Sequence, residues 1–351
     1  MLWNIPIQPA PPRSEPIAWE SLPFGRVFSQ HMAVAEYKEG SWQQVRIEPF
    51  HPLPLSPGTS ALHYGQALFE GLKAYQRPDG TRFAFRVEDH WKRLNHSAER
   101  LVMPPVPYAL FAELLHRLLT IETDLFPPTL NHALYIRPVY FAIDPWLGVR
   151  PSESYLLLIY LTPVGPYYSG PVNAYVETEM TRAAVGGTGT AKMAGNYAAA
   201  LLSGKKAQAH GCQVSLWLDA IHREYIEEFS TMNAFFVHRN HTLLTPSLQR
   251  GTILAGITRD TLLYLARKRG IAIEERDISI HEITEGIAHG EIIEVFGSGT
   301  AATVMPIQQI YYQGKSWELP PTQEIAHALL QDYKALLRGE ILAPENWIWK
   351  I

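Results

Sequence analysis

The chain has 351 residues, of which 46% are hydrophobic and 18% are charged, and its formal net charge is -4. This length and composition favour two folded domains and exclude a disordered or fibrous protein. The negative balance and the lack of any Lys/Arg-rich run argue against a nucleic-acid partner. A function on small molecules is the better expectation.

Cysteine usage and the first residues bear on the compartment. The single cysteine, Cys212, excludes an internal disulfide framework and fits a reducing environment, and we expect it to lie buried on a strand. The proline-rich first sixteen residues predict an extended arm. Since no segment has the pattern of a leader or a bilayer span, we expect a cytoplasmic protein with no membrane partner.

The first half of the chain is divided by turn residues into hairpins, helices and strands. Alternating apolar residues around Gly40 predict a hairpin over 31–47, and Pro78-Asp79-Gly80 predicts the turn of a second one over 71–86. Helical periods and apolar runs then predict, in order, a helix over 87–105 that stops at its double proline, a helix over 108–123, and buried strands over 133–143 and 154–161.

A segment rich in Pro, Gly and Tyr separates the two halves. We predict a smaller N-terminal domain over 1–165, a linker over 166–180 and a larger C-terminal domain over 181–351. Because the elements lack a strict βαβ rhythm, the predicted fold class is α+β or irregular α/β. In the second half we expect a helix after Asn196, strands over 212–218 and 233–238, a helix over 256–270, strands over 272–278 and 291–296, and a helix over 322–339.

Lys192 lies in a stretch that is otherwise free of charge, "GGTGTAKMAGNYAAALL" over 186–202. The nearest other charges are Arg182 and Lys205. A solvated loop is the usual place for a lysine, but such a loop would have polar or charged neighbours. An apolar or backbone-lined pocket disfavours the ammonium form, so the amine becomes available as a nucleophile. We favour this functional interpretation.

Two phosphate-binding fingerprints compete with it. A P-loop requires Gly before the lysine and Ser or Thr after it, whereas this chain has Ala191 and Met193. Residues 297–302, "GSGTAA", follow a predicted strand as in a dinucleotide-binding unit, with Glu318 at the spacing of a ribose-binding acid. An NAD-linked oxidoreductase is therefore a remote alternative, weakened because Pro306 interrupts the required helix.

Other local patterns remain ambiguous. The histidines are scattered, and His238 and His241 have no carboxylate or cysteine at ligand spacing, so we predict a hairpin turn there and no metal site. Gly256 precedes an amphipathic helix whose first N–H groups, with the Thr258 hydroxyl, could bind an anion. An ordinary helix start explains that pattern equally well.

Charged residues in or beside apolar strands are also candidate functional residues. Glu227 and Glu228 are adjacent acids before a strand. Two such side chains are usually exposed to solvent, and a functional role would require a cationic partner. Strand alternation places Tyr135 and Arg137 on one face. Since an arginine in an apolar strand is costly unless paired, Arg137 is either in a salt bridge or available to an anionic ligand.

Six motifs, taken together and in order, resemble the branched-chain amino acid aminotransferases, pyridoxal 5′-phosphate (PLP) enzymes of fold type IV. The resemblance covers most of the chain beyond the N-terminal arm. Within the fold type, a D-amino acid aminotransferase or an aminodeoxychorismate lyase is the alternative, but those relatives are usually shorter and are not expected to combine the first two motifs. The motifs are "YGQALFEGLKA", "LYIRP", "KMAGNYA", "EFSTMN", "GITRDTLL" and "VFGSGTA".

The resemblance implies a role for each matching residue at the cofactor. Lys192 would be the Schiff-base lysine and the group that moves the proton during transamination. Glu228 would bind the pyridine nitrogen and keep it protonated, and Tyr197 would hydrogen-bond the phenolic oxygen. The expected phosphate ligands are Arg93, Ile257, Thr258 and Thr300.

The resemblance also implies the substrates: L-leucine, L-isoleucine and L-valine, with 2-oxoglutarate as acceptor, in a ping-pong reaction that yields branched-chain 2-oxo acids and L-glutamate. Arg137 would bind the side-chain carboxylate of glutamate, and Thr231 with the N–H of Ala301 would meet the α-carboxylate. The family further implies a homodimer. The expected aromatic pocket residues are Tyr64, Phe69, Tyr135 and Tyr167.

Overall fold

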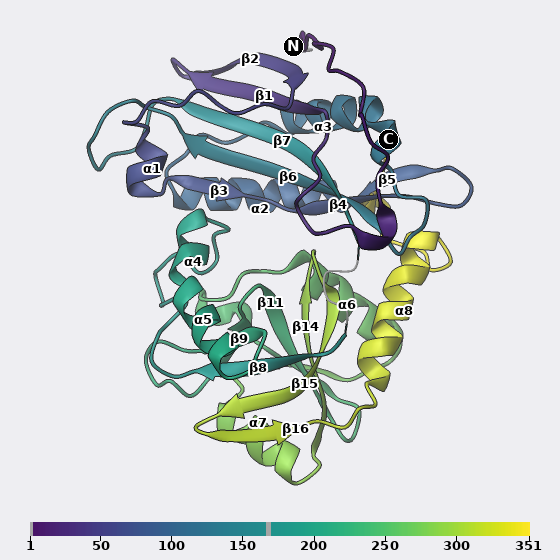
Figure 1. Ribbon diagram of the computed structural model, residues 1–351. Helices are drawn as coiled ribbons and strands as arrows, with labels where there is room; N and C mark the ends of the chain where they lie inside the picture. Colours follow the sequence, from purple (N-terminus) through teal and green to yellow (C-terminus); the bar gives the residue numbers. More distant parts are fainter. Residues whose placement is uncertain (1–2, 166–169) are drawn as a thin grey trace. The chain divides into compact units, whose positions relative to one another are not determined.

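Backbone pairing divides the chain into two units that are not contiguous in sequence. The structure, a computed structural model, describes residues 3–165 and 170–351 (Figure 1). Of these, unit 1 takes 3–165, 191–195 and 337–351, and unit 2 takes 170–190 and 196–336. Each unit combines one sheet with helices and has its own apolar core.

Unit 1 is an antiparallel sheet packed against two long helices. Within the described residues the sheet has eight strands in the order β17-β5-β4-β6-β7-β1-β2, with β3 paired to β6. The elements of unit 1 are η1 (Trp19–Ser21), β1 (His31–Lys38), β2 (Ser41–Pro49), α1 (Ser60–Tyr64), β3 (Ala67–Phe69), β4 (Leu72–Gln76), β5 (Arg82–Phe85), α2 (Val87–Arg100), α3 (Tyr108–Ile121), η2 (Thr123–Leu125), β6 (Ala133–Ala142), β7 (Tyr155–Val164), η4 (Glu345–Trp347) and β17 (Ile348–Lys350).

The apolar runs of the central strands are explained by burial on both faces of this sheet. On β7, Leu157 and Ile159 belong to the core formed with α2 and α3, while Leu156 and Leu158 pack with residues of β1 on the opposite face. Alternation therefore separates two buried sets rather than a buried and an exposed one. The two hairpins and the two helices predicted in this half are present, but the first helix ends at Arg100, before the predicted stop at its double proline.

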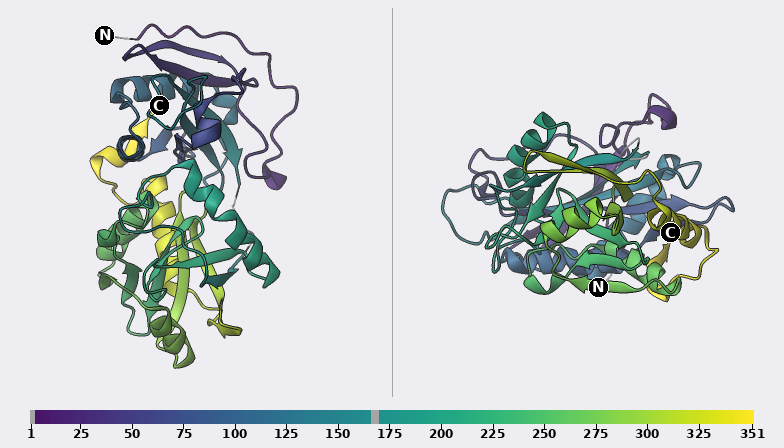
Figure 2. Two further views of the ribbon diagram at one scale, coloured as in Figure 1. Left: turned by 90° about the vertical axis from the view of Figure 1, so that its left-hand side faces the viewer. Right: turned by 90° about the horizontal axis from the view of Figure 1, so that it is seen from below.

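The proline-rich arm follows the edge of the sheet as an extended chain (Figure 2). Ile7 forms a parallel bridge with Ile47 of β2, and the backbone of Ile47 both donates to Pro6 and accepts from Gln8, at 2.9 Å each. The arm thus pairs backbone groups that an edge strand would otherwise expose.

Unit 2 is a mixed sheet with helices around it. Nine strands in the described part of the chain form the order β10-β9-β8-β15-β14-β11-β12-β13, with β16 on β15. The elements are β8 (Val172–Glu177), α5 (Leu201–Ala209), β9 (Val214–Leu218), β10 (Ile226–Phe229), β11 (Met232–His238), β12 (Leu243–Pro246), η3 (Leu248–Arg250), α6 (Ile257–Lys268), β13 (Ile273–Arg276), α7 (Ile280–Ala288), β14 (Ile292–Gly299), β15 (Thr303–Tyr312) and β16 (Lys315–Glu318).

A further pairing of β10 with β11 closes six of these strands into a ring. The ring removes two open edges and surrounds an apolar core that includes Val176, Leu216, Phe236 and Val295. Two more helices join the units along the chain: α4 (Ala194–Ala199) and α8 (Glu324–Arg338). Within residues 3–165 and 170–351, every helix is too short or too polar to span a bilayer.

The observed units differ from the predicted domain boundaries in three places. Val172–Glu177, expected within a linker, form β8, which pairs in parallel with both β15 and β9. Residues 191–195 and 337–351, expected in the C-terminal domain, belong to unit 1. The reason is long-range backbone pairing, which local composition does not reveal.

A buried carboxylate satisfies the first turn of α8. Glu294, on β14, is 2% exposed and accepts hydrogen bonds from the backbone N–H groups of Ile325 and Ala326, at 2.9 Å each. Helix N-termini leave such groups without intrahelical partners and favour negative charge nearby. Glu294 therefore fixes where α8 begins.

We predict that Glu294→Ala lowers the free energy of unfolding by about 1–2 kcal/mol, since a lost helix cap has this cost. Urea denaturation followed by circular dichroism measures the change. The matched control is Glu285→Ala, which removes an exposed glutamate of α7. Equal stability of the two variants would contradict the role of Glu294.

Candidate active site

The segment that carries Lys192 is held in unit 1 by backbone hydrogen bonds. The Lys192 carbonyl accepts from the Phe69 N–H at 3.1 Å, and Met193 forms an antiparallel bridge with Leu68, so the segment extends the sheet beside β3. The Lys192 N–H donates to Ser97 Oγ on α2 at 2.9 Å. Both backbone polar groups of Lys192 are therefore bound, which fixes the direction in which the side chain leaves.

Two basic side chains lie over one aromatic ring. Lys192 Nζ and Arg137 Cζ are each 4.7 Å from the ring centroid of Phe69. Arg137 Nη2 also donates to the Tyr135 hydroxyl at 3.4 Å, which confirms that the two β6 side chains share a face. An amine, a guanidinium and apolar rings are thus gathered in one place, and cations at this distance from a ring are attracted to it.

Arg137 retains hydrogen-bonding capacity at this site. Its Nε is buried and has no hydrogen-bond partner among the described residues. A buried, unsatisfied guanidinium donor is costly unless a ligand completes it. Of the two alternatives stated from sequence, a salt bridge or an anionic ligand, the second is favoured.

Sequence reasoning missed Phe24, which comes from the N-terminal arm. Its ring meets Tyr135 edge to face, with centroids 5.3 Å apart. No local pattern links residue 24 to residue 135, because their contact depends on how the arm folds back. Phe24 adds a further apolar surface beside Tyr135.

Arg93 is held by a buried acid. Its Nε and Nη2 donate to the two carboxylate oxygens of Glu70 at 2.7 and 3.0 Å, and Nδ1 of His90 donates to the same group at 2.7 Å. Complete burial alone would raise the pKa of Glu70, but Arg93 and His90 outweigh it and hold that pKa well below its usual range. Since Ser97 Oγ donates to the Arg93 carbonyl at 3.0 Å, one serine links the Arg93 and Lys192 segments.

Lys73 is a second unusual lysine of unit 1. It lies on β4 opposite Tyr135, and burial lowers its pKa from 10.5 to about 8. Its place inside "FEGLKAY" is typical of an ordinary strand position, so no local pattern distinguishes it. A buried amine of this kind is chemically a competitor of Lys192 for a carbonyl ligand.

In unit 2, Glu228 of β10 is the acid with a cationic partner. Its Oε1 lies 3.1 Å from Nε of Arg182, and its Oε2 accepts from the Leu254 N–H at 3.2 Å and from Asn233 Nδ2 at 3.4 Å. Both acids of the pair are buried, so the solvated alternative is wrong. An ion pair and amide donors favour the ionised carboxylate, which is a pure acceptor.

The start of α6 packs against this acid's hairpin. Gly256 is the N-cap residue, and a Cβ on it would lie 1.9 Å from Asn233 Oδ1, so only glycine fits. Ile257 and Thr258 form the first helical turn, and Thr258 is buried. The N–H groups of this turn and the Glu228 carboxylate are thereby fixed by the same asparagine.

The glycine-rich motif of residues 297–302 is a hairpin rather than a dinucleotide-binding turn. Gly297 and Gly299 end β14, and the chain turns through Thr300 and Ala301 into β15, an antiparallel strand with no helix between. The NAD-linked alternative is therefore wrong. A Cβ on Gly299 would lie 3.1 Å from the Thr231 carbonyl, which puts this turn beside the β10–β11 turn.

The remaining sequence-predicted residues have separate surroundings. Tyr197 lies on α4. Tyr64, on α1, accepts a hydrogen bond from the Gly148 N–H at 2.9 Å and so contacts the β6–β7 loop. Tyr167 lies outside the described residues. Cys212 is buried, but it precedes β9 instead of lying on it, and burial raises the pKa of its thiol to about 11.

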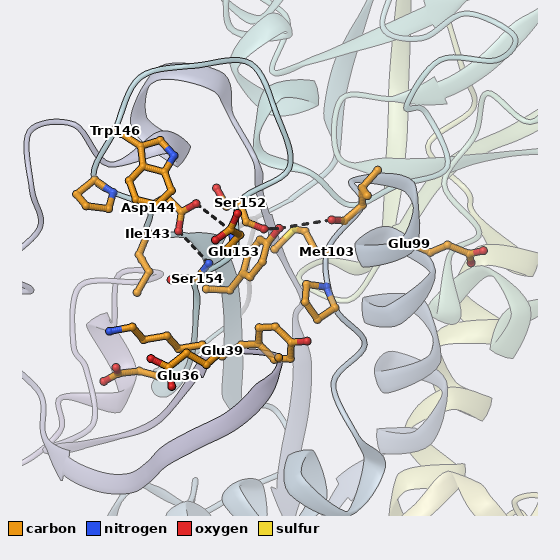
Figure 3. A pocket seen from close by; sticks show the side chains of 17 residues that line it. Glu36, Glu39, Glu99, Met103, Ile143, Asp144, Trp146, Ser152, Glu153 and Ser154 are labelled. Atoms are coloured by element: carbon orange, nitrogen blue, oxygen red, sulfur yellow. Dashed lines mark hydrogen bonds between the residues drawn. The ribbon is translucent and has the colours of Figure 1, made fainter.

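A hollow of about 1030 Å³ in unit 1 contains none of the predicted site residues (Figure 3). One of its acids, Asp144, has a structural role, since it accepts from the N–H groups of Glu153 and Ser154, at 2.9 Å each. In the described ranges no group of three or more His, Cys, Asp or Glu could hold a metal ion. His238 ends β11 and His241 lies in the turn to β12, so the predicted hairpin is present.

Comparisons with known proteins show which family the chain resembles. The family model "Amino-transferase class IV" matches residues 67–310. The branched-chain-amino-acid transaminase 1 of Bacillus subtilis (strain 168) is 45% identical, with 93% of each chain covered. The solved branched-chain amino acid aminotransferase of Escherichia coli has a TM-score of 0.75 at 26% identity, covering 91% of this chain and 98% of that one.

A further solved relative is in its cofactor-bound form. The branched-chain amino acid aminotransferase of Thermobaculum terrenum, in its PLP form, has a TM-score of 0.74 at 23% identity. The comparison covers 92% of this chain and 98% of that one. At this identity the likeness shows the shared fold alone.

The packing around Tyr135 gives a stability prediction. A Cβ on Gly71 would lie 1.8 Å from the Tyr135 hydroxyl, so Gly71→Ala must displace the ring and should lower the free energy of unfolding by about 1–3 kcal/mol. Gly204→Ala is the matched control, because it lies within α5 with open space around it and should stabilise by about 1 kcal/mol. Thermal unfolding compares the two, and a neutral Gly71→Ala would refute the packing argument.

Proposed function

The chain belongs to the class IV aminotransferases, PLP-dependent enzymes of fold type IV, and among them to the branched-chain aminotransferases; from this premise we propose that it transfers the amino group of L-leucine, L-isoleucine and L-valine to 2-oxoglutarate. The products are branched-chain 2-oxo acids and L-glutamate. One observation carries the proposal: the Lys192 amine and the Arg137 guanidinium share the ring of Phe69.

The residues present fit the cofactor. PLP, when bound, supplies an electron sink for the substrate α-carbon. Glu228 is a fixed anionic acceptor suited to the protonated pyridine nitrogen, and Gly256 leaves the first N–H groups of α6 uncovered by a side chain of its own. We assign the phenolic oxygen to Tyr197 and the phosphate to Arg93, Ile257, Thr258 and Thr300.

Lys192 is assigned the covalent and proton-transfer roles. Its amine would hold the cofactor and would also serve as the base that accepts the proton from the substrate α-carbon. The backbone bonds of Lys192 to Phe69 and Ser97 support this assignment, because proton transfer requires a fixed donor–acceptor geometry.

Substrate selection follows from the groups around Phe69. The rings of Phe69 and Tyr135 suit an aliphatic side chain, and Arg137 with its unsatisfied Nε suits the distal carboxylate of 2-oxoglutarate. Because both substrates need the same lysine and the same pocket, the first product leaves before the acceptor binds, which is a ping-pong order. We retain Thr231 and the Ala301 N–H for the α-carboxylate, and Tyr64 and Tyr167 for the pocket wall.

A homodimer in the cytoplasm completes the proposal. Leu147 and Val149 of the β6–β7 loop are 68% and 89% exposed, and Leu62 of α1 is 67% exposed. Apolar side chains grouped at this level of exposure are typical of an interaction surface. A second copy of the chain would cover them.

Lys192→Ala is expected to lower the rate of L-leucine:2-oxoglutarate transamination by roughly 1000-fold or more, since the proton-transfer group is lost. The rate is followed by L-glutamate formation. Lys205→Ala, at an exposed position of α5, is the matched control and should retain the parental rate. A Lys192→Ala variant as fast as the parent would rule out the assignment.

A substrate panel separates the related activities. We expect turnover with L-leucine, L-isoleucine and L-valine and little with D-alanine or aminodeoxychorismate. Preference for either of the last two would replace the proposed function by that of the corresponding relative.

A substitution in the exposed β6–β7 loop tests the proposed dimer. Leu147→Glu places a charge in the proposed interface and should shift the mass measured by light scattering from dimer to monomer. Leu342→Glu, at an 84% exposed position after α8, is the control and should stay dimeric. A dimer unaffected by Leu147→Glu would place the interface elsewhere.

A further inference from the structure

Arg182 is a buried residue to which the sequence motifs gave no role. Its side chain is 7% exposed, and its Nε lies 3.1 Å from Oε1 of Glu228, whose side chain is 8% exposed. A buried carboxylate remains ionised only when a cation and donors stabilise it. Arg182 supplies the charge, and the Leu254 N–H and Asn233 supply donors on the other oxygen.

Glu227, the adjacent acid, has a contrasting environment. It is 2% exposed, and the ion pair of Arg182 goes to Glu228 and not to Glu227. Burial raises the pKa of Glu227, and the negative charges of Glu228 and Asp219 raise it further. A hydrogen bond from the Thr252 side chain and the positive charge of Arg182 lower this pKa, but they do not outweigh burial. Asp219 is itself satisfied by backbone N–H groups, including those of His222 and Tyr225.

The position of Arg182 is fixed by two loops of unit 2. Its Nη2 donates to the carbonyls of Thr252 and Gly189, the latter at 3.3 Å. A Cβ on Gly189 would lie 2.1 Å from the Thr252 carbonyl, so glycine is required for these loops to meet. The guanidinium therefore lies between the strand of the acids, the loop that leads to Lys192, and the segment that leads to α6.

We propose that Arg182 is a positioning residue that selects between two adjacent acids, keeping Glu228 ionised and aimed while Glu227 stays protonated. The inference rests on the proposed function, in which Glu228 binds the pyridine nitrogen. The positive charge of Arg182 acts on both buried carboxyl groups, but Arg182 forms its ion pair with Glu228. Two neighbouring acids in environments that separate their protonation states have different roles.

The test measures PLP affinity of the apoprotein from mildly acidic to mildly alkaline pH, by absorbance titration. Arg182→Met keeps the side-chain volume without the charge, so Glu228 becomes protonated and affinity should fall on the order of 100-fold at neutral pH. The difference in PLP affinity between the parent and Arg182→Met should become smaller as the pH rises, because Glu228 of the variant ionises again. Arg182→Lys, which restores the charge, should recover part of the affinity.

Two further variants keep the test decisive if Arg182→Met fails to fold. Glu228→Gln cannot ionise and should bind PLP weakly with a deficit that does not change with pH, whereas Glu227→Gln should bind like the parent. Two results would overturn this inference and leave the proposed function intact. One is a loss of PLP affinity in Arg182→Met that does not change with pH and is not recovered in Arg182→Lys. The other is weak PLP binding by Glu227→Gln. A parent protein that binds no PLP would instead overturn the proposed function.

Discussion

The geometry of unit 1 depends on the docking of five residues, 191–195, beside β3. The bridge between Leu68 and Met193 and the hydrogen bond from the Phe69 N–H to the Lys192 carbonyl place the lysine next to Phe69 in space, although 123 positions separate them in sequence. Without this pairing, Lys192 would be a lysine in a glycine-rich loop. With it, the amine lies over an aromatic ring that it shares with Arg137.

In each unit, one proposed ligand residue is a member of a buried ion pair. Glu70 holds Arg93 in unit 1, and Arg182 holds Glu228 in unit 2. Buried pairs contribute little net stability, because desolvation offsets their attraction, but removing one partner is strongly destabilising. Their value here is orientation: each pair fixes the group to which we assign a part of the cofactor.

The parts of the fold that sequence predicted correctly are local. Val87–Arg100 and Tyr108–Ile121 have helical apolar periods with proline at or beyond their ends, and β6 shows the alternation that puts Tyr135 and Arg137 on one face. Such periodicities arise within one element and are visible without the rest of the chain. The site motifs are visible in the sequence for the same reason, since each is a short contiguous run.

The missed features all depend on residues distant in sequence. Strand β8 pairs with β15 and β9, and β17 pairs with β5, so neither has a partner nearby in the chain. Phe24 reaches Tyr135 only through the fold of the arm. The sequence does not reveal a role for Arg182, because its partner Glu228 lies far away along the chain, on β10.

The proposed function requires that Lys192, and not another amine, binds the cofactor, and chemical trapping of that bond identifies the amine. Unit 1 contains a chemically plausible competitor, Lys73, whose pKa burial lowers to about 8. Borohydride reduction of the PLP-loaded protein makes the lysine–cofactor bond permanent, and peptide mass spectrometry then locates it. We expect the phosphopyridoxyl group on Lys192, and its presence on Lys73 or on any other lysine instead would show that the assignment of Lys192 is wrong.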